Sequence, residues 1–415
     1  MPMTRPASAL AALAILVTLL AGCAAPPAPE RPVARESELD FAGAIAFAVD
    51  DLFIQLQRLP AFAPTATSEL EKKVGSALGQ KAEAKRGVIV VDTIIDSSTG
   101  QQTHATQLAE QRLYERVRER FPQFEVGPAR QELLARAGYV VAATMQQVGG
   151  DREAFRLSMS MTDVRAGLVI AQAVARVRDR SVDTTPTPYY RESPSVTRDR
   201  VVEGQVRTSE TSPGKPADSV YLERLPTNAL INEGLAAVNE GKYAAALPYY
   251  EEASRRGDGQ QLRVYNGLYV VYWNTGRVRE AEGAFGKIVA LGLATNNLAV
   301  KFLFRPRSTE FWPDPKISGP YPFWLKQIAN EVASSKRCLS VIGHSSRTGS
   351  EQVNDRLSLQ RAEAIKAKLV SETGELADRI QTSGAGYRDN LIGTGTDDQR
   401  DALDRRVEFR VVTCS

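Results

Sequence analysis

The 415-residue sequence is poor in the side chains that most often build catalytic and metal centres. It contains two histidines, His104 and His344, and three cysteines, and none of them stands in a cluster with metal-ligand spacing. It also lacks a Walker loop, a zinc constellation and a nucleophile elbow. The sequence therefore predicts no catalytic residue, no metal site and no cofactor, and we do not expect an enzyme.

The sequence also lacks a strong excess of charge of one sign. Its 52 Lys and Arg residues and 49 Asp and Glu residues are interspersed, and the net charge is +3. Nucleic-acid-binding faces are built from clustered basic residues, so we expect no nucleic-acid partner. Beyond the N-terminal segment, no stretch of the sequence is long and apolar enough to span a bilayer.

The N-terminal segment predicts export and lipid attachment. Arg5 precedes an apolar run over residues 7–21, which is too short for a stable membrane span and has the shape of a secretory signal. The run ends in Leu-Ala-Gly-Cys, which resembles the lipobox of bacterial lipoproteins. That resemblance implies a signal peptide over residues 1–22 and an acylated Cys23. An ordinary signal peptide with an incidental cysteine is the alternative.

The residues after Cys23 predict where the lipid holds the protein. Ala24 and Ala25 stand where inner-membrane lipoproteins often carry aspartate, so the resemblance to sorted lipoproteins implies the outer membrane, with the protein facing the periplasm. Residues 23–38 are rich in proline and predict an extended tether. The compartment is oxidising, so we expect the remaining pair, Cys338 and Cys414, to be either a disulfide between antiparallel strands or two free buried thiols.

Residues 39–180 predict an α/β layer domain. Apolar periodicity indicates helices near 39–59, 104–121 and 129–138, strands near 86–96, 123–127 and 139–148, and a hairpin over 155–179. We expect Leu108, Leu113 and Val117 to share the buried face of the second helix. The element order and the segments "LLARAGYVVAATMQQV" and "LSMSMTDVRAGLVIAQA" resemble lipoprotein domains related to penicillin-binding-protein activators and to flagellar and curli accessory lipoproteins.

Residues 181–225 are rich in Pro, Ser, Thr and Arg and show no sustained apolar period. This composition predicts a linker that wraps or spaces domains, with Tyr189 and Tyr190 as exposed loop residues.

Residues 226–297 contain an internal repeat. Gly241 and Gly276, Ala246 and Ala281, and Tyr250 and Phe285 occupy equivalent positions in "NEGLAAVNEGKYAAALPYYEEASRRG" and "YNGLYVVYWNTGRVREAEGAFGKIVALG". The offset is close to the tetratricopeptide period of about 34 residues, so the segment resembles a tetratricopeptide pair. Two units are fewer than the three that usually bury a continuous core, and we expect the pair to pack on a neighbouring domain. Its concave face is either a peptide-binding site or part of a structural spacer.

Residues 298–415 predict alternating strands and helices. The segment "GHSSRTGSEQVNDRLSLQRAEAIKAKLV" and the later "DRRVEFRVV" resemble the OmpA-like peptidoglycan-binding domain, whose motifs they follow in order and spacing. The complete fold prediction is an α/β multidomain protein: an N-terminal α/β layer domain, a central α-helical tetratricopeptide pair, and a C-terminal OmpA-like α/β sandwich with a mixed sheet.

The OmpA-like resemblance implies a site for a diaminopimelate-type stem peptide of peptidoglycan. Arg361 would bind a ligand carboxylate with its planar fork, and Asn354 would support it. Ser346 stands where the family carries the acid that pairs with the ligand ammonium, which implies weaker binding unless Asp355 compensates. Ser345 and Arg405 complete the expected site. A further departure is Asp404, which replaces an asparagine of the last motif.

The sequence thus predicts a non-enzymatic outer-membrane lipoprotein that binds peptidoglycan noncovalently. Its partners would be the stem peptide, the membrane lipid reached through Cys23, and envelope proteins that the sequence does not name. The alternative is an assembly or regulatory module, such as a wall-synthase activator or a flagellar or secretion accessory, whose OmpA-like site no longer binds the wall.

Overall fold

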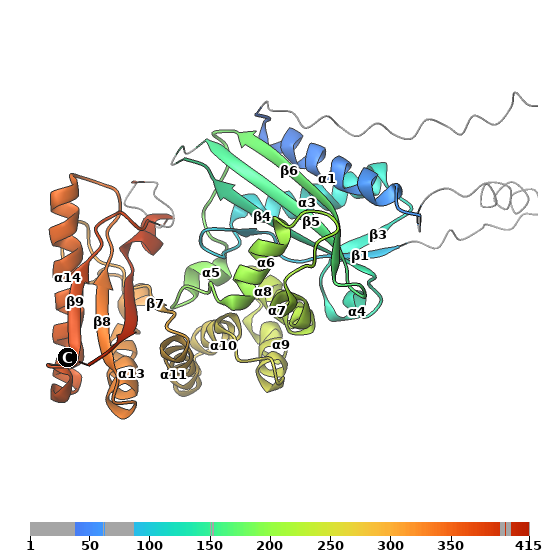
Figure 1. Ribbon diagram of the computed structural model, residues 1–415. Coiled ribbons are helices and arrows are strands. Elements are labelled where there is room, and N and C mark those ends of the chain that lie inside the picture. Colours follow the sequence, from blue (N-terminus) through green and yellow to red (C-terminus); the bar gives the residue numbers. More distant parts are fainter. Residues whose placement is uncertain are drawn as a thin grey trace, which may run out of the picture.

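The structure, a computed structural model, describes residues 38–60, 62, 87–149, 151, 153–390, 395 and 400–414. The expected signal peptide, the lipobox with Cys23 and nearly all of the expected tether lie outside these residues. Within the described part, a helix-covered sheet is followed by helix pairs and then by a second, smaller sheet (Figure 1). No helix in this part of the chain is long and apolar enough to cross a membrane.

The first sheet is mixed and has six strands in the order β3-β1-β4-β5-β6, with β2 paired to β4. β1 runs parallel to β3 and β4, whereas β4, β5 and β6 form an antiparallel meander. The strands are β1 (Val88–Val91), β2 (Ile95–Asp96), β3 (Glu125–Pro128), β4 (Tyr139–Gln147), β5 (Ala154–Asp163) and β6 (Leu168–Arg178). They confirm the strands and the hairpin expected from the sequence.

Alternation along β5 gives this sheet two different faces. Leu157, Met159 and Met161 belong to an apolar cluster with α1 (Phe41–Gln57) and α3 (His104–Arg120), as their spacing predicts. Two helical expectations are wrong. Leu108 is exposed, because the buried stripe of α3 passes through small residues instead, and the helix expected near 129–138 is only α4 (Gln131–Leu134).

The expectation that residues 181–225 form a linker without regular structure is wrong. This segment forms three helices, α5 (Pro188–Glu192), α6 (Arg200–Ser209) and α7 (Ser219–Glu223). The helix α6 covers the Ser/Thr face of the first sheet, where Ser160 Oγ donates to Thr208 O at 2.6 Å and the Thr144 and Ser209 hydroxyls are 2.8 Å apart. The buried face of α6 mixes two valines, Val201 and Val202, with Gln205, Thr208 and Ser209, and it is a short stretch within a segment rich in Pro, Ser and Thr.

The two tyrosines of this segment are also buried, which corrects the expectation that they are exposed. Tyr189 and Tyr190 are at most 1% exposed, with ring centroids 4.7 Å apart. The Tyr189 hydroxyl donates to Arg263 O at 2.5 Å, and its ring stacks near that of Tyr250. Both tyrosines therefore join α5 to the core of the helical region.

The expected repeat forms two helix pairs, α8 (Leu225–Asn239) with α9 (Tyr243–Arg255) and α10 (Leu262–Asn274) with α11 (Val278–Ala294). Gly241 and Gly276 have φ values of 71° and 72° at the two turns, a conformation that side chains with a Cβ rarely adopt. The repeated aromatics, Tyr250 and Phe285, are fully buried. The helices and turns predicted from the repeat are thus present.

The last region forms a four-stranded sheet in the order β7-β10-β8-β9. β10 is antiparallel to both neighbours, and β8 is parallel to β9, so the sheet is mixed as predicted. The helices α13 and α14 pack against each other and share a core with this sheet (Figure 1). The elements are β7 (Leu298–Val300), α12 (Pro315–Ser318), α13 (Tyr321–Ser334), β8 (Cys338–Gly343), α14 (Glu351–Glu372), the 3-10 turn η1 (Gly374–Leu376), β9 (Ile380–Gly384), the 3-10 turn η2 (Arg400–Arg405) and β10 (Val407–Val412).

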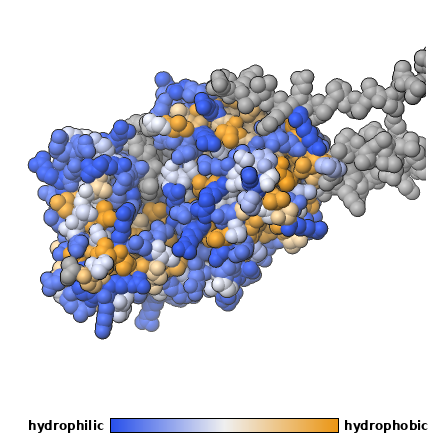
Figure 2. Space-filling model, viewed as in Figure 1, coloured by the Kyte–Doolittle hydropathy of each residue, from blue (hydrophilic) through white to orange (hydrophobic). Residues whose placement is uncertain are grey.

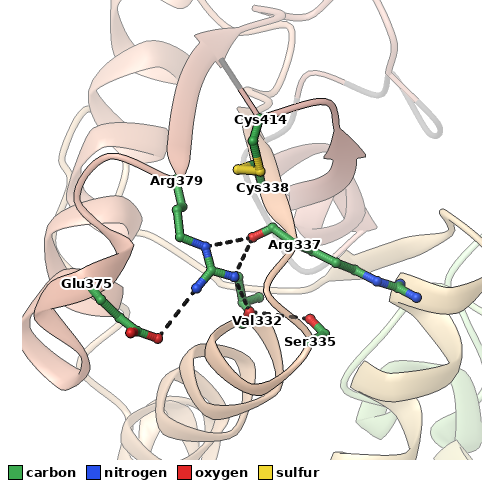
Figure 3. Close-up of a disulfide and its surroundings, with 7 residues drawn as sticks. All are labelled: Val332, Ser335, Arg337, Cys338, Glu375, Arg379 and Cys414. Carbon is green, nitrogen blue, oxygen red and sulfur yellow. Dashed lines mark hydrogen bonds and ion pairs between the residues drawn. A yellow bond between two sulfur atoms is a disulfide. The ribbon is translucent and has the colours of Figure 1, made fainter.

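A disulfide joins Cys338, at the start of β8, to Cys414, just after β10 (Figure 3). The antiparallel register sets Val412 opposite Cys338 and leaves the two cysteine Cα atoms 5.2 Å apart. Beside the disulfide, Arg379 donates to Arg337 O at 2.7 Å and to Val332 O at 2.5 Å (Figure 3). Its guanidinium therefore provides hydrogen-bond donors for carbonyl oxygens in the last turn of α13 and just after it. Closing a loop of this length contributes on the order of 4 kcal/mol in the chain-entropy view.

We predict that Gly267→Ala destabilises the protein by about 1–3 kcal/mol through overpacking. A Cβ at this position of α10 would overlap the Tyr250 ring, which is held between Gly234 and Gly267. The measurement is the thermal unfolding midpoint. Gly283→Ala in α11 is the matched control, because a Cβ there meets no atom within 4 Å, and it should stabilise the helix. Equal behaviour of the two variants would contradict this packing.

Candidate functional site

Two loops and the first turns of α14 enclose a small cleft in the C-terminal region. One loop, residues 344–350, follows β8, and the other, residues 305–308, lies between β7 and α12. The cleft has a volume of about 200 Å³ and is lined by Pro306, Arg307, Ser346, Thr348, Gly349, Ser350, Val353, Asn354, Leu357 and Arg361. The structure thus brings together three of the residues predicted from the sequence: Ser346, Asn354 and Arg361.

Asn354 shapes the loop on one side of the cleft. Its buried amide nitrogen donates to Thr348 O at 3.0 Å and to Ser350 O at 3.1 Å. Between these two acceptors Gly349 has a φ of 99°, which a residue with a side chain would adopt only under strain. The asparagine therefore holds a tight loop at the N-terminus of α14, where backbone N–H groups favour an anion.

Arg361 lies two turns further along α14 on the same helix face. It is 1% exposed, and its guanidinium donates through Nε to Ser308 O and through Nη2 to Arg305 O, both at 3.2 Å. The guanidinium carbon also lies 5.0 Å from the centre of the Phe304 ring. Arg361 therefore lines the cleft and at the same time fixes the loop that forms its opposite wall.

Arg307 is a cleft residue that sequence reasoning missed. It is exposed, has a φ of 55°, and lies on the loop 305–308, which carries none of the recognised motifs. Arg307 and Arg361 are the cationic residues of the described lining, and none of the described lining residues is acidic. A guanidinium can pair with a carboxylate or another anionic group.

The remaining predicted residues lie elsewhere. Ser345 is buried, and its backbone N–H donates to Gly386 O at 2.9 Å. Arg405 is buried at the end of η2, just before β10. Neither is among the described residues that line the cleft. Both contribute to the packing of the loops behind it.

Asp355 does not supply the missing acid, which corrects the suggestion that it compensates for Ser346. The Asp355 carboxylate forms an ion pair with Arg388 at 2.7 Å. Asp355 is not among the described residues that line the cleft. Adjacent positions on a helix point about 100° apart, so Asp355 cannot share the inward face of Asn354. Asp404, the other departure from the family motif, is fully buried.

His344 has a structural position behind the cleft. The imidazole is buried, and its Nε2 lies 3.4 Å from a carboxylate oxygen of Glu408, which also accepts a hydrogen bond from Arg406 at 2.6 Å. Burial would raise the pKa of Glu408, but the hydrogen bond with His344 and the charge of Arg406 outweigh it and hold that pKa well below its ordinary value. No group of three or more potential metal ligands occurs among the described residues.

A family model described as the OmpA family matches residues 315–403. The C-terminal domain is OmpA-like. The matched range includes both Asn354 and Arg361, and it leaves the first sheet and the helix pairs unmatched.

Curated relatives match the same part of the chain. Outer membrane protein Omp38 of Acinetobacter baumannii is 38% identical over 100 residues, which is 24% of this chain and 28% of that protein. The probable lipoprotein YiaD of Escherichia coli K12 is 37% identical over 74 residues, which is 18% of this chain and 33% of that protein. The chain therefore spans about a third or less of the length of these relatives.

Solved structures also match 28% of this chain. The peptidoglycan-associated lipoprotein from Burkholderia pseudomallei matches over 89% of its own length, with 22% identity and a TM-score of 0.22. The cell wall anchor of the T6SS from Pseudomonas aeruginosa matches over 80% of its length, with 24% identity and a TM-score of 0.23.

We predict that Glu408→Gln weakens the pairing of β8 with β10 at pH 7. The pKa of Glu408 is lower in the folded protein than its ordinary value of 4.5. The stabilisation that the ionised Glu408 carboxylate gives to the fold is therefore fully present above pH 4.5 and is lost as the pH falls toward the pKa of the folded protein. Protection of β8 and β10 amides from hydrogen exchange should fall about tenfold or more at pH 7 and by less at pH 3. Glu375→Gln, at an exposed carboxylate, is the control. A loss of protection that is equal at both pH values would contradict the assignment.

Proposed function

We propose that this chain is a non-enzymatic envelope protein that binds peptidoglycan noncovalently through the cleft at Asn354 and Arg361. The observation that carries the proposal is the position of Arg361, inside the OmpA-family match and in a cleft whose described lining holds cations and no carboxylate. The names of the similar proteins, an outer membrane protein, a lipoprotein, a peptidoglycan-associated lipoprotein and a cell wall anchor, support the same compartment and ligand.

The ligand that fits this chemistry is a stem peptide of the diaminopimelate type. Its carboxylate would face Arg361 and Arg307, which offer charge-assisted hydrogen bonds. Its ammonium would face the Ser346 hydroxyl, which can accept a hydrogen bond but carries no charge. The site would therefore depend mainly on the carboxylate, and binding would be weaker than in a cleft with an aspartate at that position.

Lipid attachment at Cys23 would complete an anchor between the outer membrane and the wall. We propose an outer-membrane location with the described domains in the periplasm, since the N-terminal sequence has a lipobox and the similar proteins include an outer membrane protein and a lipoprotein. Acyl chains on one residue give durable attachment to a bilayer. Residues 23–38 would then be the lipidated cysteine and its tether.

A second candidate function is an assembly or regulatory module, favoured by Ser346 and by the extent of the chain outside the family match. The first sheet would be the activator-like domain, and α8–α11 the tetratricopeptide pair. These two regions would bind envelope proteins, and the OmpA-like cleft would have lost its wall ligand.

We predict that the full chain carrying Cys23→Ala, and so without lipid, co-sediments with isolated peptidoglycan. Arg361→Ala should weaken binding about tenfold or more, because a charged hydrogen bond is lost from a partly buried site. Arg307→Ala should weaken it less, since that side chain is exposed and solvent screens its charge. Ser346→Asp should strengthen binding of the diaminopimelate ammonium.

Arg356→Ala is the matched control, because Arg356 is exposed on α14 and is not among the described residues that line the cleft. Since Arg361 also holds the loop 305–308, the unfolding midpoint of each variant is measured alongside, and Arg307→Ala tests the cleft without that structural role. Wild-type binding that neither arginine variant reduces would contradict the proposal. Binding gained only with Ser346→Asp would favour the second candidate.

A further inference from the structure

A second, larger cleft lies where the helix pairs meet the C-terminal domain. It has a volume of about 780 Å³ and is enclosed by α5, α10, α12 and α13 together with residues 301–303. None of the described residues that line it also lines the cleft at Arg361. Its volume is in the range of pockets that hold small ligands or short peptide segments, about 300–1,000 Å³. On the face shown in Figure 2, by comparison, apolar residues form separate clusters among hydrophilic ones.

The wall of this cleft is a fixed group of aromatic rings. Tyr190, Tyr269, Trp273, Tyr321 and Trp324 all line it. The rings of Tyr269 and Trp273 are nearly parallel, with centroids 6.2 Å apart, and Trp324 Nε1 donates to the Tyr269 hydroxyl at 3.2 Å. Trp273 is partly exposed while the others are buried. A large apolar side chain entering the cleft would therefore meet a preformed surface.

Gln101 is the polar feature that points to a ligand. Its side chain is 1% exposed and lines the cleft, yet neither its amide nitrogen nor its amide oxygen has a hydrogen-bond partner in the described part of the chain. A buried polar group without a partner destabilises a protein, so it needs an explanation. A carboxamide offers a donor and an acceptor side by side, which complement the N–H and C=O of one residue in an extended peptide.

The charges of the cleft favour a ligand with a carboxylate. Lys301 is half-buried and donates through Nζ to Tyr190 O at 2.7 Å, and burial lowers the pKa of Lys301 to about 7. Arg191 and Lys316 are exposed at the mouth. Glu192, the acidic residue among the described residues of the lining, already accepts a hydrogen bond from Asn274 at 2.9 Å. Even with Lys301 only partly protonated near pH 7, Arg191 and Lys316 outnumber this one acid in the described lining.

We propose that this cleft binds a short acidic peptide segment of a partner protein that carries large apolar side chains. The aromatic wall takes an apolar side chain, the Gln101 amide pairs with the N–H and C=O of one ligand residue, and Lys301 with Lys316 holds a carboxylate. This site and its partner lie outside the proposed wall binding and do not depend on it. Because the cleft is built from α5, α10, α12 and α13 together, it is complete only when the helix pairs and the C-terminal domain are packed.

The test is an array of pentapeptides built from Asp, Lys, Ser, Leu and Phe, probed with the full-length Cys23→Ala protein. Peptides that combine Asp with Leu or Phe should be retained, and their Lys counterparts should not. Gln101→Leu should reduce retention about tenfold, because the N–H and C=O of the bound ligand residue lose their partners. The same variant should unfold at a higher temperature, since it removes a buried polar group without a partner. Loss of binding together with a gain in stability separates a binding role from a folding role.

Lys301→Met should abolish the preference for Asp over Ser peptides, and Trp273→Ala should weaken retention of all apolar peptides. Gln360→Leu and Lys326→Met, at exposed positions on α14 and α13, are the matched controls and should behave as the unsubstituted protein. The proposal is overturned if no class of peptide is retained, if Lys peptides are preferred, or if Gln101→Leu changes neither retention nor the unfolding midpoint. The array contains no peptidoglycan, so its outcome is separate from that of the sedimentation assay.

Discussion

The architecture depends on a buried carboxylate at the end of β1. Asp92 is fully buried and accepts a hydrogen bond from Asn232 at 2.8 Å, while the Thr93 hydroxyl donates to Asn232 Oδ1 at 2.9 Å. On the same helix, Asn228 accepts from the buried guanidinium of Arg263 at 2.8 Å. Burying such groups is costly unless each has partners, so these hydrogen bonds favour the observed packing of the first sheet on α8 and of α8 on α10.

The helix pairs also pack against the C-terminal domain and so connect it to the first sheet. One apolar cluster runs without a break from Tyr189, through α8–α11 and α13, to Phe409 on β10. The OmpA-like domain is therefore packed on the helices rather than carried on a spacer. If lipid at Cys23 and a wall ligand at Arg361 hold the two ends, the packed helices contribute to the distance between them.

The sequence predicted elements whose signal is local. Three such signals each occupy a short stretch of sequence. The alternation predicts β5, and Gly241 and Gly276 predict two helix turns, all of which are present in the structure. The third signal is the motif that contains Asn354 and Arg361, and the structure places both residues in one cleft. The features that were missed arise from distant contacts. The helix α6 is buried against serines of β5, and Arg307 reaches the cleft only through the path of a loop without a motif. Neither was recognised in the sequence, because α6 is a short amphipathic helix within a segment rich in Pro, Ser and Thr, and the loop of Arg307 has no motif.

The two clefts are joined by a line of packed aromatic rings. Arg361 lies over Phe304, whose ring centroid is 5.3 Å from that of Phe311, and Phe311 in turn lies 4.9 Å from Tyr321 on the wall of the larger cleft. A packed interior transmits displacement because it has little free volume. A displacement of these rings would therefore reach residues of both clefts. One arrangement is present in the structure, and coupling between ligands would need a second arrangement of these rings that the two ligands favour differently.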